Sequence, residues 1–221
     1  MILAIDTATR WLGLALHDGT AVVAELGWRC LNNHTIELAP NLHEMMHRAS
    51  VTPADLSGIA VAIGPGSYTG LRVGLSLAKG LALANQTPLI GIATLDIVAA
   101  AFGPFPGQLL VVAEAGRTRV CVAPYEWENG RGWQTESTPT IESWETLLPT
   151  LEGRVTFAGE ITAQAIKQIK ATSKTFQIAS PATAIRRAGY LAELGWRRLR
   201  AGKVDDAQTL APIYLRDPAG N

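Results

Sequence analysis

Small residues recur at every fourth position between residues 64 and 84 of this chain. The series is Gly66, Gly70, Gly74, Ala78 and Ala82, and this spacing places them along one face of a helix. Each interior glycine costs a helix up to about 1 kcal/mol relative to alanine, so several of them need a compensating contact. Close approach of another backbone is the usual compensation. The stripe therefore predicts a long helix that meets the chain's own sheet or helices, another subunit or, at its first glycines, an anion.

The loop before this helix, GPGSYTG at residues 64–70, invites comparison with phosphate-binding loops. It lacks the G-x-x-x-x-G-K-[ST] spacing of a P-loop. It also departs from G-x-G-x-x-G, because Thr69 stands where the third glycine belongs. Neither nucleotide-binding motif is therefore present in this loop.

Apolar runs and turn residues predict the order of elements in the first half. Strands are expected at 2–5, 11–17, 21–26, 58–63 and 89–92, and helices at 38–49, 66–84 and 95–102. The turn Asp18-Gly19 separates the second and third strands. Pro40 indicates that the first helix starts near it or bends there. The order β-β-β-α-β-α-β-α predicts an α/β fold, a mixed sheet with helices on its faces.

The segment FGPFPGQ, residues 102–108, is the best candidate for a domain boundary. We therefore expect one domain at 1–103 and a smaller one at 104–221. In the second, strands are expected at 109–113, 120–125, 155–158 and 175–178, and helices at 163–171 and 184–201. The last helix is expected to pack back on the first domain.

Composition excludes several classes of function. Hydrophobic residues make up 48% of the chain, and 19 basic residues balance 19 acidic ones, so nothing global attracts a nucleic acid. The apolar run 70–84 is too short to span a membrane. With no secretion signal and only two cysteines, we expect a cytoplasmic protein with reduced thiols. A basic stripe in the last helix is interpreted as a solvated face rather than an RNA contact: Arg186, Arg187, Arg197, Arg198 and Arg200.

The segment HEMMH, residues 43–47, matches the H-E-x-x-H pattern of zinc metalloproteases. His43 and His47 lie one helical turn apart, but a protease needs a third protein ligand. Ser50 and Pro53 occupy the positions where a metzincin has its glycine and third histidine, and no acid lies between Asp55 and Asp96. We interpret the histidines as flanking a hydrophobic seam, with a metal-dependent peptidase as the alternative.

Four segments resemble the bacterial TsaB (YeaZ) family: ILAIDTAT, GPGSYTGLRVGLSLAKGLA, PLIGIATLD and, near the C-terminus, APIYLRDP. The resemblance covers the first hundred residues in order and returns at the end. It implies the ASKHA fold of actin and sugar kinases, with two RNase H-like subdomains. It also implies a non-catalytic subunit that acts with TsaD, TsaE and an adenylate-forming enzyme to make threonylcarbamoyladenosine in tRNA.

The same resemblance implies that the first two helices contact TsaD, or a second copy when the chain is alone. Docking of TsaE would need this pair, and tRNA would be contacted mainly through the complex. The implied partner interface comprises Leu38, Leu42, Met45, Met46, Gly70, Val73, Gly74, Leu77 and Leu81. On this view Gly70→Leu or Leu42→Asp would weaken the complex while the isolated fold survives.

The resemblance also bears on catalysis and cofactors. TsaD-like proteins carry two metal-binding histidines where this chain has Thr94 and Val98, which bind iron or zinc poorly. Asp6 and Thr7 keep the position of the nucleotide-binding aspartate of active ASKHA members, so an ATP-binding enzyme is a further alternative. The candidate nucleotide residues are Asp6, Thr7, Gly66 and Ser67. No cofactor or metal is expected on this chain alone, and ATP or ADP is expected, if anywhere, at the complex interface.

One segment departs from the family pattern. Relatives often have Asp-Ala-Arg and then Gly-Glu at the strand that opens the second half. Here the segment from Glu114 to Arg119 reads EAGRTR, so the acid is a glutamate and the second acid is replaced by Arg119. A catalytic or nucleotide role for this segment is not expected.

Overall fold

A computed structural model describes residues 1–30, 33–116 and 119–215. Internal contacts divide the chain into two compact units. Unit 1 contains Met1–Ile97 and Arg186–Ile213, and unit 2 contains Val98–Ile185 together with Tyr214 and Leu215. The chain thus leaves unit 1 after Ile97 and returns to it at Arg186. The sequence placed the boundary near residue 103 and assigned the last helix to the second domain, with packing back on the first. No helix among the described residues is long and apolar enough to cross a membrane.

The sheet of unit 1 has five strands in the order β3-β2-β1-β4-β5. They are β1 (Ile2–Asp6), β2 (Trp11–His17), β3 (Val22–Arg29), β4 (Gly58–Gly64) and β5 (Leu89–Ala93). The strands β1, β2 and β3 pair antiparallel, whereas β4 is parallel to β1 and β5 is parallel to β4. This is the predicted mixed sheet.

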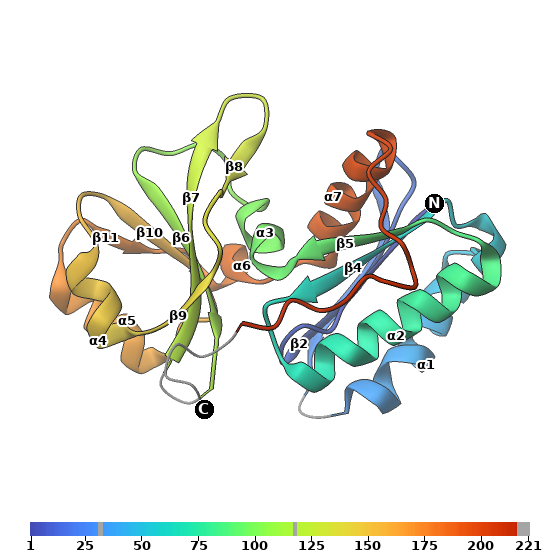
Figure 1. Ribbon diagram of the computed structural model, residues 1–221, viewed down its shortest axis with the longest axis horizontal. Helices are drawn as coiled ribbons and strands as arrows, with labels where there is room; N and C mark the ends of the chain where they lie inside the picture. The colour runs from blue at the N-terminus through green and yellow to red at the C-terminus, as the bar shows by residue number, and fades with distance from the viewer. Residues whose placement is uncertain (31–32, 117–118, 216–221) are drawn as a thin grey trace. The chain divides into compact units, whose positions relative to one another are not determined.

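Helices cover both faces of this sheet (Figure 1). Because successive side chains of a strand point to opposite faces, Leu3 and Ile5 of β1 join a core with α1 (His34–Arg48) and most buried side chains of α2 (Tyr68–Asn85). Ile2 and Ala4 join the other core, against α7 (Ala188–Arg200). The predicted packing of the last helix on the first domain is therefore the packing of α7 within unit 1.

Two helix starts differ from the sequence expectation. Helix α1 begins at His34, so the predicted start near Pro40 is wrong, and Pro40 lies exposed inside the helix. The helix expected at 184–201 is broken into α6 (Pro181–Ala184) and α7, because the backbone of Ile185 and Arg187 is extended. Because of this break, Arg186 lies between α6 and α7 and not inside the helix that the sequence predicted.

The edge strand β5 is covered by the segment that follows α7. Asp205 forms a bridge with Leu89, and its carboxylate accepts a 2.8 Å hydrogen bond from the backbone of Gly91. Further along, the backbone N–H of Ile213 donates to the carbonyl of Ile63 at 2.7 Å. Figure 1 shows this red segment running beside β5 and β4. A covered edge does not offer its backbone to another strand.

Unit 2 contains a six-stranded sheet. Its elements are β6 (Gln108–Glu114), β7 (Arg119–Glu128), β8 (Gly132–Gln134), β9 (Thr140–Ser143), α4 (Trp144–Leu147), β10 (Val155–Gly159), α5 (Ala163–Thr172) and β11 (Phe176–Ile178). The strand order is β11-β10-β6-β7-β8, and β9 also pairs with β7. The core beneath α4 and α5 includes Phe157, Trp144 and Ile169. Helix α3 (Thr94–Ala99) spans the change from unit 1 to unit 2.

Candidate functional site

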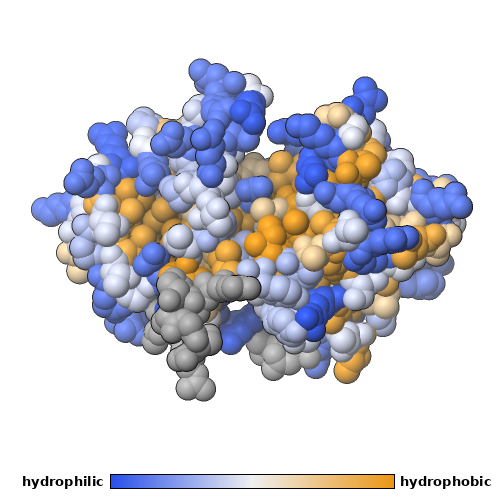
Figure 2. All heavy atoms as spheres, viewed as in Figure 1, coloured by the Kyte–Doolittle hydropathy of each residue, from blue (hydrophilic) through white to orange (hydrophobic). Residues whose placement is uncertain are grey.

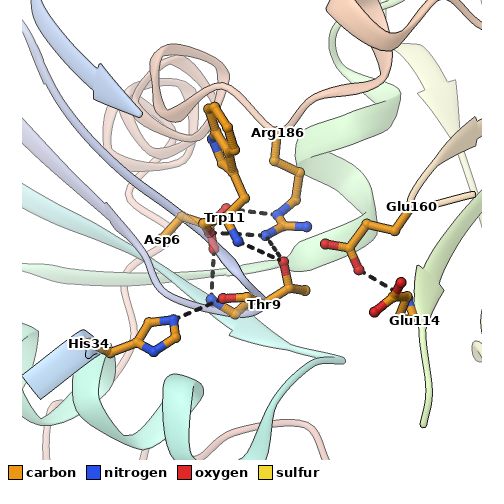
Figure 3. Close-up of polar contacts among 8 residues, drawn as sticks. Asp6, Thr9, Trp11, His34, Glu114, Glu160 and Arg186 are labelled. Carbon is orange, nitrogen blue, oxygen red and sulfur yellow. Dashed lines mark hydrogen bonds and ion pairs between the residues drawn. The ribbon is translucent and has the colours of Figure 1, made fainter. Parts of the chain in front are cut away.

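The carboxylate at the end of β1 is held by a buried ion pair. Asp6 is the last residue of β1 and Arg186 precedes α7, and both side chains are buried. The Nε atom of Arg186 donates to Oδ2 of Asp6 at 2.8 Å, and the backbone N–H of Ala8 donates to Oδ1 at 2.9 Å (Figure 3). A terminal nitrogen of Arg186 also donates to Oγ1 of Thr9 at 2.7 Å. Both carboxylate oxygens therefore have partners within unit 1.

The loop after Asp6 lies directly against the glycine stripe. The hydroxyl of Thr7 donates to the carbonyl of Gly70 at 2.7 Å. A Cβ atom at Gly66 would lie 2.2 Å from the carbonyl oxygen of Ala8. At Gly70 it would lie 2.2 Å from the carbonyl oxygen of Thr7, and at Gly74 2.2 Å from Oγ1 of Thr7. The stripe exists because the chain's own loop occupies the space where side chains would be.

This contact gives Gly70 and Gly74 a role within the chain. Both are buried against Thr7, and their predicted role in the partner interface stays a prediction. Gly70→Leu would place its side chain where the Thr7 backbone already is, and Leu42 is itself buried in the core. We therefore expect both variants to destabilise the isolated fold. This differs from the expectation drawn from the resemblance, and neither expectation is yet tested.

The start of α2 is organised by Ser67. Its hydroxyl caps the helix by accepting from the backbone N–H of Gly70 at 3.3 Å, and its own N–H donates to the carbonyl of Ala8 at 2.6 Å. The structure thus brings together the four candidate nucleotide residues Asp6, Thr7, Gly66 and Ser67. The polar groups named here are already bonded within the chain, and the nucleotide role stays a prediction.

The predicted interface residues of α1 are also core residues. Leu38, Leu42, Met45 and Met46 are all buried in the cluster beneath the sheet. All four side chains are largely covered within the free chain, although Leu38 also lines the groove between α1 and α2. Their predicted role as contact residues stays a prediction. Helical spacing identifies an apolar seam, but it does not tell whether the seam faces inward or outward.

The large apolar residues of α2 in the predicted interface are less buried than those of α1. Val73, Leu77 and Leu81 are only partly buried and pack at the margin of the core. Val73 and Leu77 also line a groove of about 510 Å³ between α1 and α2. Its lining residues are Thr35, Leu38, Ala39, Tyr68, Thr69, Arg72, Val73, Ser76 and Leu77. Where α2 begins, the guanidinium of Arg72 lies 3.7 Å from the ring centre of Tyr68.

Apolar side chains that sequence periodicity missed are exposed on the same two helices. Among the described residues, the three most exposed large hydrophobic side chains are Ile36, Leu83 and Tyr68, at 70%, 58% and 56% exposure. All three belong to α1 or α2. Figure 2 shows apolar side chains, in orange, reaching the surface over α2 between hydrophilic groups. We call Ile36, Tyr68, Val73, Leu77 and Leu83, with the groove, the α1–α2 surface.

The histidines of HEMMH lie exposed on the outer side of α1. The rings of His43 and His47 are nearly parallel, with centres 6.4 Å apart. Glu44 between them forms an ion pair with Arg48 at 2.6 Å, which lowers the pKa of the Glu44 carboxyl. Among residues 1–30, 33–116 and 119–215, no group of three histidine, cysteine, aspartate or glutamate side chains is placed to hold a metal. The pair thus lacks the ligand set of a zinc protease.

Thr94 and Val98, which the resemblance places at the positions of two metal histidines, are both buried. Thr94 has a hydroxyl with no hydrogen-bond partner among the described residues, and Val98 is apolar. Neither side chain is a good ligand for iron or zinc.

In unit 2, polar side chains surround the end of β6. The backbone N–H of Glu114 donates to the carboxylate of Glu160 at 3.0 Å (Figure 3). A small hollow of about 90 Å³ lies here, lined also by Arg119, Glu145 and Gln168. Arg117 and Thr118 of the altered segment lie outside the described residues.

The basic stripe predicted near α7 is paired within unit 1. Besides the Arg186 pair, Arg187 bonds the carboxylate of Glu25, Arg197 bonds Glu193, and Arg198 lies 3.3 Å from Asp205. Arg200 lies over the ring of Trp196, 5.9 Å from its centre. These arginines therefore serve the fold of unit 1, and the interpretation as a freely solvated face is only partly correct.

Solved structures with the same architecture define the class. YeaZ from Pseudomonas aeruginosa superimposes with a TM-score of 0.76 at 22% identity, covering 97% of this chain and 99% of that one. Component A of (R)-2-hydroxyglutaryl-CoA dehydratase from Acidaminococcus fermentans gives a TM-score of 0.52 at 12% identity, covering 90% and 98%. At these identities the likeness shows the fold alone. The two mixed sheets with flanking helices confirm the predicted ASKHA fold.

Sequence comparison then gives the family. The family model for TsaD, tRNA N6-adenosine threonylcarbamoyltransferase, matches residues 29–220. The tRNA threonylcarbamoyladenosine biosynthesis protein TsaB of Bacillus subtilis is 34% identical over 97% of this chain and 93% of its own length. The chain belongs to the TsaB (YeaZ) family, and the predicted resemblance is confirmed.

Proposed function

We propose that this chain is a non-catalytic subunit of the machinery that makes threonylcarbamoyladenosine in tRNA. It pairs with TsaD through the α1–α2 surface and supports docking of TsaE, acting in the cytoplasm. When TsaD is absent, the same surface pairs two copies of the chain. The observation that carries the proposal is the α1–α2 surface on a chain of the TsaB family.

The character of this surface supports a protein partner. Large apolar side chains exposed together around a groove are typical of interaction sites. Tyr68 and Arg72 belong to the residue types that contribute most to binding when a partner buries them. The two helices are anchored from below by the core, so the surface is rigid before a partner arrives.

Two features support a non-catalytic role: the residues at the expected metal positions, and the pairing of Asp6. Thr94 and Val98 stand where TsaD-like proteins place metal ligands. The carboxylate of Asp6 is neutralised by Arg186 at 2.8 Å, and an aspartate held this way is a poor site for a nucleotide's metal. We therefore propose that the chain holds no cofactor of its own, and that any ATP or ADP lies at the interface with TsaD.

Binding to TsaD tests the surface directly. We expect the double variant Ile36→Asp, Leu83→Asp to keep its melting temperature, because both side chains point to water in the free chain. Its affinity for TsaD should fall by about tenfold or more, since two charges would be buried in an apolar interface. The matched control is Val23→Asp, Val204→Asp, which makes the same kind of change at exposed positions elsewhere. Equal affinity of both variants for TsaD would contradict the assignment.

The two enzymatic alternatives make different predictions. A peptidase requires stoichiometric metal and loss of activity in His43→Ala. An ATP-binding enzyme requires nucleotide binding by the isolated chain that Asp6→Ala removes. We expect neither result, and either one would replace the proposal.

A further inference from the structure

The arginines near α7 and the lysines of α5 differ in their partners. The arginines at and after residue 186 have partners within unit 1: Asp6, Glu25, Glu193, Asp205 and the ring of Trp196. In unit 2, Lys167, Lys170 and Lys174 are exposed. Their side chains form no ion pair or hydrogen bond with any residue that the structure describes. Because these three lysines lie within eight residues of one another, α5 and the link after it carry a local concentration of positive charge.

These lysines are gathered at one end of the unit 2 sheet. Lys170 lies in the last turn of α5 and Lys167 one turn before it. Lys174 lies in the link to β11, beside the start of β10, because the hydroxyl of Thr175 donates to the carbonyl of Gly153 at 2.5 Å. Arg154 follows Gly153 and is likewise exposed, without a side-chain partner among the described residues. We call Arg154, Lys167, Lys170 and Lys174 the α5 basic surface.

Little negative charge is available to neutralise this surface. No aspartate or glutamate occurs between Glu160 and Glu193 in the sequence. Glu145 accepts a 2.9 Å hydrogen bond from Gln168, and Glu152 lies two residues before Arg154. Glu114 and Glu160 line a hollow with Gln164 and Gln168, toward the start of α5. Positive charge therefore predominates at the end of α5, although the whole chain is neutral.

We propose that the α5 basic surface contacts the phosphate backbone of an RNA. The inference rests on the proposed function, which brings the chain to tRNA. Lysine ammonium groups on flexible stems bind phosphates as point charges and read no sequence. Such contacts would add affinity and orientation to the assembly while TsaD carries the chemistry. A lysine in the last turn of a helix also favours the helix dipole, so a purely structural role for Lys170 is the rival that the test separates.

The test measures tRNA binding by the assembled proteins over a range of salt concentrations. In the variant Lys167→Gln, Lys170→Gln, Lys174→Gln, we expect affinity near physiological salt to fall about tenfold. The slope of log affinity against log salt should fall by about two to three, since each phosphate contact contributes about 0.7 to 0.9. The same three positions changed to arginine should bind as the natural chain does. The control is Arg131→Gln, Arg197→Gln, Lys203→Gln, which removes equal charge elsewhere.

The outcomes separate this inference from the proposed function. Capture of TsaD without RNA reports on the α1–α2 surface, and it should be unaffected by the lysine changes. If TsaD is captured but salt slope and affinity match the control, the α5 basic surface does not contact RNA. If the lysine variant has a lower melting temperature but unchanged tRNA affinity and salt slope, the lysines stabilise the helix and the inference is overturned. Lysine-dependent binding to vesicles of phosphatidylserine, with none to tRNA, would overturn the inference in favour of an anionic membrane.

Discussion

Units 1 and 2 are built on the same strand connectivity and differ in what they do with it. In each, a central strand, β1 or β6, pairs antiparallel with the next strand and parallel with a later one, β4 or β10. The central strand of each ends in an acid, Asp6 or Glu114. Asp6 is buried and paired with Arg186, whereas Glu114 is exposed beside Glu160. One acid has become part of the core, and the other remains at the surface.

The loops that follow the parallel strands extend the correspondence. Strand β4 ends at Gly64 and β10 at Gly159, with φ of 112° and 106°, a conformation that favours glycine. Three residues later, Ser67 and Thr162 cap the following helices in the same way. The helices then diverge, because α2 meets the loop of Thr7 through glycines while α5 has Ala165 at the position that corresponds to Gly70.

The difference shows how one topology supports two roles. In unit 1, the ion pair and the glycine contact fix the loop after β1 and α2 together, which suits a rigid support for a partner surface. In unit 2, shorter helices and exposed charges leave polar groups at the surface. We therefore expect stability to depend on the β1 loop and not on its counterpart.

The largest effect is expected from the buried ion pair. Asp6→Ala leaves Arg186 charged and buried, so the free energy of unfolding should fall by about 3–5 kcal/mol. Glu114→Ala, the corresponding change in unit 2, should alter it by less than about 0.5 kcal/mol. Urea denaturation measures both. Equal losses of unfolding free energy would contradict the proposed difference between the two loops.

The glycine contact predicts an intermediate effect. Gly74→Ala would bring a Cβ to 2.2 Å from Oγ1 of Thr7, so we expect a loss of about 1–3 kcal/mol. Gly80→Ala on the same helix meets no atom within 4 Å and should stabilise the chain by up to about 1 kcal/mol. Thermal unfolding of the two variants distinguishes them. Stabilisation by Gly74→Ala would show that the close contact is absent.

The helix caps test whether the two units resemble each other at the helices that follow β4 and β10. Ser67→Ala and Thr162→Ala each remove a side chain that accepts a backbone N–H, at 3.3 and 3.2 Å. Each should cost about 1 kcal/mol in unfolding free energy. Similar losses measured by urea denaturation would support the correspondence of the two loops, and a negligible loss at Thr162 alone would limit it to the backbone.

The smallest expected effect concerns the thiols, one in each unit. Burial raises the pKa of Cys121 to about 12 and also raises that of Cys30. Because the thiolate is the reactive form, neither should react with iodoacetamide at pH 8 in the native chain, and both should react in denaturant. Mass spectrometry gives the number of labels. A label on the native chain would identify the unit that opens locally.

Much of the fold was predictable from the sequence. Alternating apolar runs gave the strands of unit 1, and the spacing of glycines indicated a close backbone contact before its partner was known. The pairing of Asp6 with Arg186 was not predictable, because no local pattern links residues so far apart in the chain. The resemblance implied two similar subdomains, but which residues correspond was not visible in the sequence, since Gly70 and Ala165 share a position and differ in residue type.

The proposed α1–α2 surface was the least predictable part of the molecule. Leu42 and Met45 follow helical spacing because they belong to the core, whereas Ile36 and Leu83 interrupt the polar faces of their helices. Periodicity detects the first kind of residue and overlooks the second. The arginines near α7 were only partly predictable: Arg187 and Arg197 are exposed as expected, but a sequence does not show that each has an acidic partner.

The most direct test is threonylcarbamoylation of tRNA with TsaD, TsaE and the adenylate-forming enzyme from the same organism. Product should form with the natural chain and with His43→Ala. It should fall strongly when the chain is omitted or replaced by the variant Ile36→Asp, Leu83→Asp. Undiminished product without the chain, or with that double variant, would contradict the account of a non-catalytic partner acting through the α1–α2 surface.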